Sequence, residues 1–208
     1  GAAYKGACGY LFYRIIKALG VFYAKVFYFL KTTGRENTQM EGAYIIAPNH
    51  MSMHDVIFVS ASMQRQIYYM AKSELFKNRL LGWLIRKLGG FPVQRGKQDI
   101  TAIKTSLQIL KRGDILGIFP EGTRVKQGEN VRAKTGVALF AYKTKRPVVP
   151  VGISTKDQKR RLFRRVYVNF GTPITFEEFA FADGGAQELQ RASNMIMERV
   201  HDLMGQGR

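Results

Sequence analysis

The amino-acid sequence predicts an α/β fold in which a single mixed β-sheet is flanked by helices. Short apolar runs, typical of buried strands, alternate along the chain with segments whose apolar residues recur at helical spacing. Strands that alternate with helices favour a sheet covered by helices on both faces. No linker divides residues 36–208, so these elements are expected to share one sheet.

The composition suits one globular domain with an anionic partner. The chain has 208 residues, of which 46% are hydrophobic, so it can bury a core and is not a disordered chain. Lysine and arginine number 33 against 15 acidic residues, and the net charge of +18 points to nucleic acid, a membrane surface or a phosphorylated substrate. The single cysteine, Cys8, excludes an internal disulfide framework.

The first predicted element is a helix over residues 9–30, GYLFYRIIKALGVFYAKVFYFL. Arg14, Lys17 and Lys25 interrupt it, and a charge at the centre of a bilayer costs roughly 2.5 to 3.5 kcal/mol, so the helix is not expected to span a membrane. The three cations fall within a sector of about 80° on a helical projection, and the other faces are aromatic and aliphatic. This amphipathic pattern is typical of a helix that lies in a bilayer interface. The alternative is a helix packed on the protein's own core.

The chain is therefore divided into a membrane-associated helical segment, residues 1–33, and a folded domain, residues 34–208. The first half of the domain is predicted to contain, in order, a strand at 44–47, a helix to about 63, a strand at 66–71, a helix at 73–88 and a strand at 91–95. Ser52 or Asp55 is placed to cap the first of these helices, and Gly89 follows the second.

The second half of the domain continues the alternation. Its predicted elements are, in order, a helix at 99–112, a strand at 115–119, a helix at 132–144, strands at 147–153 and 166–170, and a closing helix at 188–204. In the first of these helices, Ile100, Ile103, Leu107 and Leu110 recur at helical spacing, and Gly113 is a plausible C-terminal stop.

Two histidines and an aspartate follow the strand at 44–47, in the stretch APNHMSMHD. His50 and Asp55 are separated by four residues. Histidine has an unperturbed pKa of about 6.5, which suits a general base near neutral pH. A carboxylate can hold such a ring in one tautomer and stabilise the cation formed on proton uptake. The pair is a candidate for deprotonating an alcohol, and the alternative is a loop histidine beside a helix cap.

A second motif, FPEGTR at residues 119–124, lies where the strands of open α/β sheets carry ligands. Gly122 lets the backbone approach a ligand closely, and Arg124 offers a planar fork that suits a phosphate. Glu121 could orient Arg124 or bind a hydroxyl. The alternative is an ordinary turn with a surface ion pair.

These two motifs resemble those of the glycerolipid acyltransferase family, and within it those of bacterial 1-acyl-glycerol-3-phosphate acyltransferases. Two further blocks match in order: GGFPVQR at 89–95 resembles the arginine-bearing second block, and RPVVPVGI at 146–153 resembles the apolar fourth block. Asn49 and the stretch AKSELF at 71–76 also fit, whereas Gln94 stands where the family often has an acidic residue. The resemblance covers about residues 40–175.

The resemblance implies direct acyl transfer from a thioester to the free hydroxyl of 1-acyl-glycerol 3-phosphate, which gives phosphatidic acid. His50 would be the general base, Asp55 its orienter, Arg124 a ligand of the acceptor phosphate and Arg95 a second phosphate contact. The remaining candidate site residues are Glu121, Gly122 and Thr123, with Asn49, Lys72 and Lys134 as further contacts. Acyl-CoA or acyl-carrier protein would be the donor substrate, and no cofactor is implied.

Other residues of the sequence suggest different chemistry. His54 lies four residues after His50, a spacing used for zinc, but the glutamate of H-E-x-x-H is absent, so no metal is expected. Ser52 does not stand in a G-x-S-x-G elbow, so a serine triad is not expected. The basic run KDQKRRLFRR, 156–165, is either a solvated loop or a contact for anionic lipid or for an acidic acyl-carrier protein.

The leading hypothesis is an O-acyltransferase on the cytoplasmic face of a bacterial membrane, attached as a peripheral or monotopic protein. A rival within the family acylates glycerol 3-phosphate or another lysophospholipid. A rival of a different class is a basic lipid- or nucleic-acid-binding protein without catalysis. The sequence has no helix-turn-helix, zinc-finger or RNA-binding aromatic signature, so a nucleic-acid partner is not expected.

Overall fold

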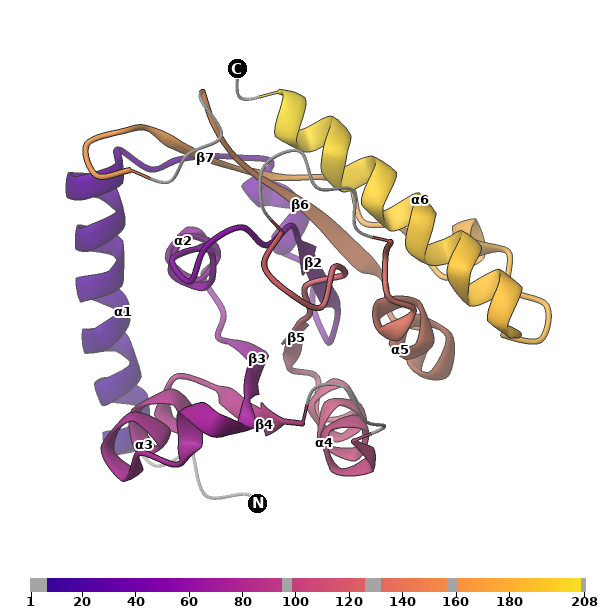
Figure 1. Cartoon of the computed structure of the whole chain (residues 1–208), viewed down its shortest axis with the longest axis horizontal. Helices are drawn as coiled ribbons and strands as arrows, with labels where there is room; N and C mark the ends of the chain where they lie inside the picture. Colours follow the sequence, from indigo (N-terminus) through magenta and orange to yellow (C-terminus); the bar gives the residue numbers. More distant parts are fainter. Residues whose placement is uncertain (1–6, 95–98, 126–131, 157–160, 207–208) are drawn as a thin grey trace.

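The protein is described from a computed structural model that covers residues 7–94, 99–125, 132–156 and 161–206 (Figure 1). Within these residues the strands form one seven-stranded mixed sheet, in the order β1-β7-β6-β2-β5-β3-β4. Strands β6 and β7 are antiparallel, and every other neighbouring pair is parallel. The predicted fold class, a single mixed sheet flanked by helices, is therefore confirmed.

The strands of the sheet are β1 (Lys31–Thr33), β2 (Ile45–Pro48), β3 (Ile67–Lys72), β4 (Gly90–Val93), β5 (Ile115–Gly117), β6 (Val148–Thr155) and β7 (Val166–Phe170). The six predicted strands are all present. Strand β1 was not predicted, because it has only three residues, KTT, and no apolar pattern. Its backbone pairing with β7 makes it a strand, and it belongs to the segment assigned to residues 1–33.

The α-helices are α1 (Ala7–Tyr28), α2 (Asp55–Ser62), α3 (Arg79–Lys87), α4 (Ile100–Lys111), α5 (Gly136–Thr144) and α6 (Ala186–Gly205). Short 3-10 helices are η1 (Arg35–Thr38), η2 (Ser73–Phe76) and η3 (Glu177–Phe179). The single helix predicted at 73–88 is wrong, because Asn78 is extended and caps α3 by accepting the N–H of Leu81 at 3.0 Å. The start predicted at residue 132 is also early, since α5 begins at Gly136.

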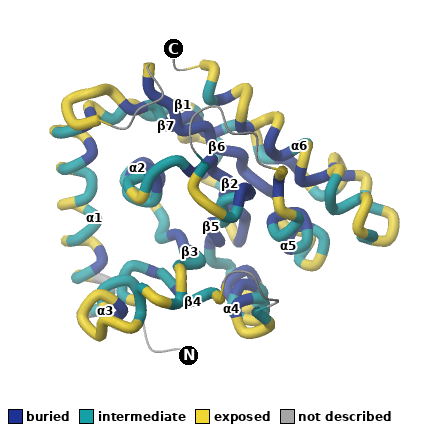
Figure 2. Tube along the Cα trace, viewed as in Figure 1, coloured by how far each residue is buried: buried dark blue, intermediate teal, exposed yellow. Residues whose placement is uncertain are grey.

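The sheet carries a hydrophobic core on each face. Successive residues of a strand point to opposite sides, so Ile45 packs with the helices α4, α5 and α6, while Ile46 packs with α1 and α2. Figures 1 and 2 show α1 and α2 on one side of the sheet and α5 and α6 on the other. This double cover explains why β2 and β6 are buried along their whole length.

Helix α1 packs on α2 with one side and leaves the other side exposed (Figure 2). Tyr13, Ala24 and Tyr28 are buried on the inner side. The outer side carries a row of exposed apolar residues, here called the apolar stripe: Leu11, Ile15, Leu19, Phe22, Val26 and, just beyond the helix, Phe29. In the part of the chain that the structure describes, no helix is long and apolar enough to cross a membrane.

The three cations of α1 do not share one solvated face. The half-buried Lys17 turns towards the protein, where its Nζ donates a hydrogen bond to the Gln64 carbonyl at 2.7 Å. Burial lowers the pKa of Lys17, and the charge of Arg35 lowers it further. Arg14 and Lys25 are exposed. Only two of the three cations are therefore placed beside the apolar stripe.

Candidate active site

Two loops that carry the candidate residues leave the same edge of the sheet. Strands β2 and β5 are parallel neighbours, with Ile45 paired to Leu116. The loop after β2 holds His50, and the loop after β5 holds the stretch 119–124. Because both loops follow the carboxyl ends of their strands, the topology brings the two motifs together at the edge where such sheets bind ligands.

His50 and Asp55 form a buried pair. The Nδ1 atom of His50 lies 3.2 Å from Oδ2 of Asp55, which is the first residue of α2. The same oxygen accepts the backbone N–H groups of Met51 at 2.7 Å and Ser52 at 2.6 Å. These two N–H groups hold the carboxylate in place at the start of the helix. The Asp55 carboxylate can accept a hydrogen bond from a protonated Nδ1 of His50, which leaves Nε2 as the basic nitrogen.

Neighbouring residues fix the position of the His50 ring and backbone. The ring stacks on Phe119, with centroids 3.9 Å apart and planes at 25°. The Asn49 side chain makes two hydrogen bonds with the backbone of Ile153 in β6, at 2.7 and 3.1 Å. The Val125 N–H donates to the His50 carbonyl at 2.8 Å, which ties the two site loops together.

Glu121 forms a second tie between the loops. It is buried, and its Oε2 accepts the backbone N–H of His50 at 2.6 Å. Burial raises the pKa of Glu121 to about 7; the hydrogen bond from His50 opposes the rise, and the charge of Asp55 adds to it. The carboxyl group therefore faces the backbone beside the catalytic candidate, and its predicted contact with substrate stays a prediction.

Gly122 permits a close approach at the turn of FPEGTR. Its φ of 66° lies in the left-handed region that favours glycine. A Cβ atom built there would lie 2.6 Å from Cδ of Lys134, so a larger residue would displace that side chain. The Lys134 N–H donates to the Pro120 carbonyl at 2.8 Å, which holds this lysine against the turn.

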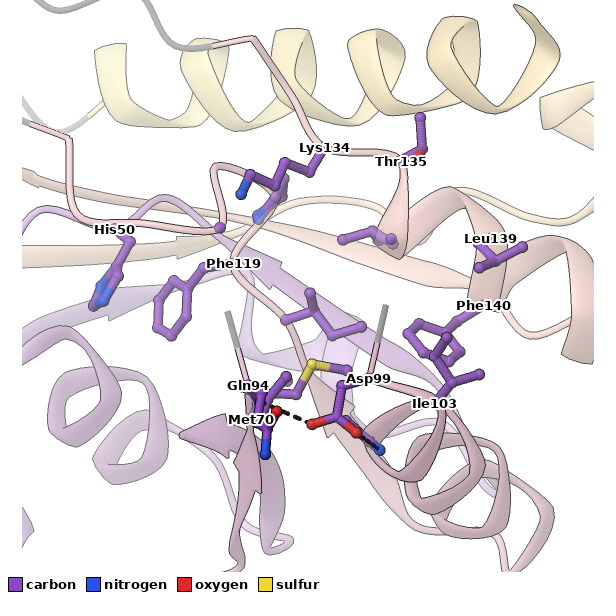
Figure 3. Close-up of a pocket in the computed structure, with 18 residues that line it drawn as sticks. His50, Met70, Gln94, Asp99, Ile103, Phe119, Lys134, Thr135, Leu139 and Phe140 are labelled. Carbon is purple, nitrogen blue, oxygen red and sulfur yellow. Dashed lines mark hydrogen bonds between the residues drawn. The ribbon is translucent and has the colours of Figure 1, made fainter. Parts of the chain in front are cut away.

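His50 opens onto a cavity of about 470 Å³ (Figure 3). Phe119, Gly122 and Lys134 line it together with His50, and Figure 3 shows the Lys134 side chain on the same side as His50. Its other walls come from separate elements and are mainly apolar: Met70 of β3, Val93 of β4, Ala102 and Ile103 of α4, and Val137, Leu139 and Phe140 of α5. The site thus combines a histidine, a cation and a hydrocarbon-lined space.

One wall of the cavity is held by a capping carboxylate. Asp99 accepts the Ala102 N–H at 2.9 Å, which caps α4, and it also accepts the Gln94 N–H at 2.8 Å (Figure 3). Gln94, which stands where the family often has an acidic residue, also lines the cavity. Asp99 and the apolar wall residues were missed by the sequence analysis, because their roles depend on how distant elements meet.

The other predicted site residues lie outside this cavity lining. Thr123 and Arg124 are exposed. Lys72 is also exposed, and its Nζ pairs with Glu74 at 3.0 Å. Arg95 lies outside the described residues. The structure therefore brings His50, Asp55, Gly122 and Lys134 together, whereas the phosphate contacts expected of Arg124 and Arg95 stay predictions.

His54 has a packing environment that differs from that of His50. Its Nδ1 lies 2.9 Å from Oγ of Ser52, and its ring lies among Tyr23, Tyr28 and Phe58, between α1 and α2. Across the described residues, no group of three or more His, Cys, Asp or Glu side chains is placed to hold a metal ion. His54 is thus part of the contact between two helices.

Comparisons with known proteins agree with this geometry. The family model described as Acyltransferase matches residues 29–154. The 1-acyl-sn-glycerol-3-phosphate acyltransferase of Bacillus subtilis is 32% identical over 177 residues, which cover 84% of this chain and 87% of the relative. The protein of that name from Streptococcus pneumoniae is 34% identical over 70% of this chain, which spans 55% of its length.

A solved structure gives the same result for the fold. The crystal structure of the 1-acyl-sn-glycerophosphate (LPA) acyltransferase PlsC from Thermotoga maritima superposes with a TM-score of 0.71 at 26% identity. The match covers 92% of this chain and 79% of that one. On the family model, the relatives and the geometry around His50, the chain belongs to the acyltransferase family.

Proposed function

We propose that this protein transfers an acyl group from a thioester to the free hydroxyl of 1-acyl-glycerol 3-phosphate, giving phosphatidic acid. The observation that carries the proposal is the buried His50–Asp55 pair at a cavity that also contains Lys134 and apolar walls. The names of the B. subtilis and S. pneumoniae relatives support the acceptor. An acceptor of this kind needs a base, a cation for its phosphate and space for hydrocarbon.

The reaction follows from the orientation of His50. With Nδ1 directed to Asp55, Nε2 takes the proton of the acceptor hydroxyl while its oxygen attacks the thioester carbonyl carbon. The tetrahedral intermediate collapses, the carbon–sulfur bond breaks, and the imidazolium returns the proton to the departing thiolate. General-base catalysis of this kind contributes about 10² to 10⁴-fold, and the remaining acceleration comes from positioning and from stabilising the developing oxyanion.

The two ends of the substrates are assigned to different parts of the site. The apolar walls from α4 and α5 suit an acyl chain, because they remove hydrocarbon from water. Lys134 supplies a positive charge next to His50. Arg124 directly precedes Val125, whose N–H is hydrogen-bonded to the His50 carbonyl. The long exposed side chain of Arg124 therefore starts beside the His50 loop, and we assign it to the acceptor phosphate.

The acceptor is a membrane lipid, and the apolar stripe of α1 gives the enzyme a surface that suits a bilayer interface. We place the protein on the cytoplasmic face of a bacterial membrane, attached as a peripheral or monotopic protein. Acyl-CoA and acyl-carrier protein are the two candidate donors, and neither is a permanently bound cofactor.

A product assay tests the proposed reaction. The protein is incubated with detergent-dispersed 1-acyl-glycerol 3-phosphate and either acyl-CoA or an acylated acyl-carrier protein, and phosphatidic acid is measured by mass spectrometry. Product formation that His50→Ala abolishes supports the proposal. If the enzyme instead preferred glycerol 3-phosphate, or a lysophospholipid without a phosphate monoester, the proposed acceptor would be wrong. Lipid binding without turnover, unchanged in His50→Ala, would make the protein a non-catalytic lipid-binding protein.

A further inference from the structure

The basic run singled out in the sequence meets the end of α1. The Phe163 N–H donates a hydrogen bond to the Phe27 carbonyl at 2.7 Å, and the two rings lie 6.0 Å apart. Figure 1 shows the coloured segment that leads into β7 beside the C-terminal end of α1. Residues 161–165, RLFRR, are all exposed. Residues 161–165, which directly precede β7, are thus joined to the helix that carries the apolar stripe through Phe163.

A cavity of about 670 Å³ lies at this junction. It is called the hairpin pocket and is lined by Phe29, Lys156, Phe163, Arg164, Arg165 and Tyr167. Its three cations form no ion pair with any carboxylate of the described residues. Guanidinium groups bind phosphate oxygens in a bidentate manner, and an ammonium group adds a point charge. The hairpin pocket therefore has the charge and the donors to hold a phosphate group.

Two aromatic residues of the hairpin pocket, Phe29 and Phe163, have an unfavourable backbone conformation. Phe29 and Phe163 have φ values of 42° and 60°, in the left-handed region that bulky residues rarely adopt. Both residues remain exposed, at 48% and 62% of their accessible surface, so burial offsets only part of that cost. Phe29 also ends the apolar stripe. Exposed aromatic rings beside cations are typical of surfaces that enter the interface of an anionic bilayer.

We propose that the hairpin pocket binds the phosphate group of an anionic bilayer phospholipid, which is a neighbour of the substrate and is not itself acylated. The cavity beside His50 is lined by different elements, chiefly α4 and α5, so the two sites are separate. The proposal rests on the membrane association proposed above and is independent of the acyl transfer. With the apolar stripe, the hairpin pocket gives the protein a second point of contact, which fixes its rotation on the membrane.

Vesicle flotation with the whole 208-residue chain tests the proposal. Vesicles of phosphatidylcholine alone are compared with vesicles that also contain phosphatidylglycerol, at low and high salt. An arginine near an anionic surface contributes about fivefold in binding, so Arg164→Ala/Arg165→Ala should bind the anionic vesicles roughly 25-fold more weakly at low salt. Salt should reduce this difference, and binding to phosphatidylcholine alone should change little. Lys104→Ala/Lys111→Ala, which removes two exposed charges from α4, is the matched control and should change binding less than twofold.

Two further variants separate the explanations. Phe163→Gly places a glycine in the left-handed conformation, so it should keep the melting temperature or raise it while weakening binding to both kinds of vesicle. A lower melting temperature with unchanged binding would make Phe163 a folding residue and overturn its role here. Leu19→Gln/Phe22→Gln removes the centre of the apolar stripe.

The outcomes are distinct. If the wild type floats, the stripe variant does not, and Arg164→Ala/Arg165→Ala binds like the wild type, the hairpin pocket proposal is overturned and membrane association stands. If the wild type does not float with either vesicle, membrane association itself fails. If the arginine variant loses affinity for acyl-carrier protein but keeps its affinity for anionic vesicles, the pocket belongs to the carrier, and the lipid proposal is wrong.

Discussion

His50 and His54 differ in what surrounds their imidazole rings. His50 faces a cavity and pairs with Asp55, whereas His54 lies among the aromatic rings between α1 and α2. We expect His50→Ala to lower kcat by about 10² to 10⁴ while the fold stays intact, because the proton acceptor is lost. His54→Ala should remain active but lose about 1 to 2 kcal/mol of unfolding free energy through its lost ring contacts. Steady-state kinetics and urea unfolding of both variants check this. If His54→Ala were stable but inactive, the assignment of His50 as the base would be wrong.

Arg124 is expected to act on the acceptor rather than on the thioester. A charge-assisted bidentate bond to phosphate contributes about 1.5 to 3 kcal/mol, so Arg124→Ala should raise the KM for the acceptor by about 10- to 100-fold. The KM for the thioester should stay within about twofold of the wild-type value. Both constants are measured by varying each substrate in turn. Arg146→Ala is the control, because Arg146 is exposed and precedes β6 at the opposite edge of the sheet. An effect confined to the thioester would move Arg124 to the donor side.

Glu121 gives the stability of the fold a dependence on pH. Its pKa is raised from 4.5 to about 7, chiefly by burial, so between these values the folded state keeps a proton that the unfolded state has released. Stability is therefore highest below pH 4.5 as far as this group is concerned, and it falls as the pH rises to about 7. Above that pH the folded state carries the full cost of a buried charge.

Glu121→Gln should remove this dependence. The amide oxygen can still accept the His50 N–H, so the variant should be more stable than the wild type at pH 8, by about 1 to 3 kcal/mol, and equal to it near pH 4.5. Urea unfolding at the two pH values measures the difference. Glu121→Ala, which loses the acceptor, should also lose activity, whereas Glu121→Gln should keep most of it. A Gln variant that is less stable at pH 8 would show that the charge itself is needed.

At the residue scale, the sequence revealed only what is close along the chain. His50 and Asp55 stand within one loop and the start of the following helix, so their spacing made them a candidate pair, and the structure shows them in contact at 3.2 Å. The bond between Glu121 and the His50 backbone spans 71 residues and depends on β2 and β5 being neighbours. The apolar wall residues carry no mark in the sequence that distinguishes them from ordinary core.

At the scale of elements, α4 shows how a cap can shape a binding site. Asp99 joins the start of α4 to Gln94 at the end of β4, and both residues line the cavity. Asp99→Ala should lower the melting temperature by about 2 to 4 °C, since a helix cap is lost, and should weaken the use of long acyl thioesters more than short ones. Asp99→Asn keeps an oxygen that can cap and is the control. If chain-length preference is unchanged in the Ala variant, α4 does not shape the acyl site.

The element predictions succeeded where burial imposes a pattern. Strands β2, β5 and β6 are buried on both faces, so they appear as continuous apolar runs. The predicted helix at 73–88 was wrong because its apolar spacing continues through Asn78, where a cap starts a new helix. Strand β1 has no such pattern, because partner strand β7 and not its own sequence decides its conformation.

At the scale of the whole molecule, the expected attachment to a membrane has a single topology. The apolar stripe faces outward while Lys17 is bonded to the protein body, so α1 should lie along the bilayer surface. Tags at the two chain ends should therefore be equally accessible to protease from the same side of sealed vesicles. A tag inserted into an exposed loop of the domain is the control for access, and protection of one end alone would show that the chain crosses the membrane.

The link between α1 and the sheet is short and firmly held. Only Phe29 and Leu30 separate the helix from β1, and the Leu30 N–H donates to the Ala24 carbonyl at 3.2 Å. Strand β1 is itself fixed to β7, where the Thr33 hydroxyl donates to Asn169 at 2.7 Å. Such a connection does not act as a hinge between α1 and the sheet. In the proposed membrane-bound state, His50 is therefore held at a fixed height above the lipid. Acceptor molecules reach it by diffusing in the plane of the bilayer, so turnover should follow the number of acceptors per unit area and fall when inert lipid dilutes them at constant total amount.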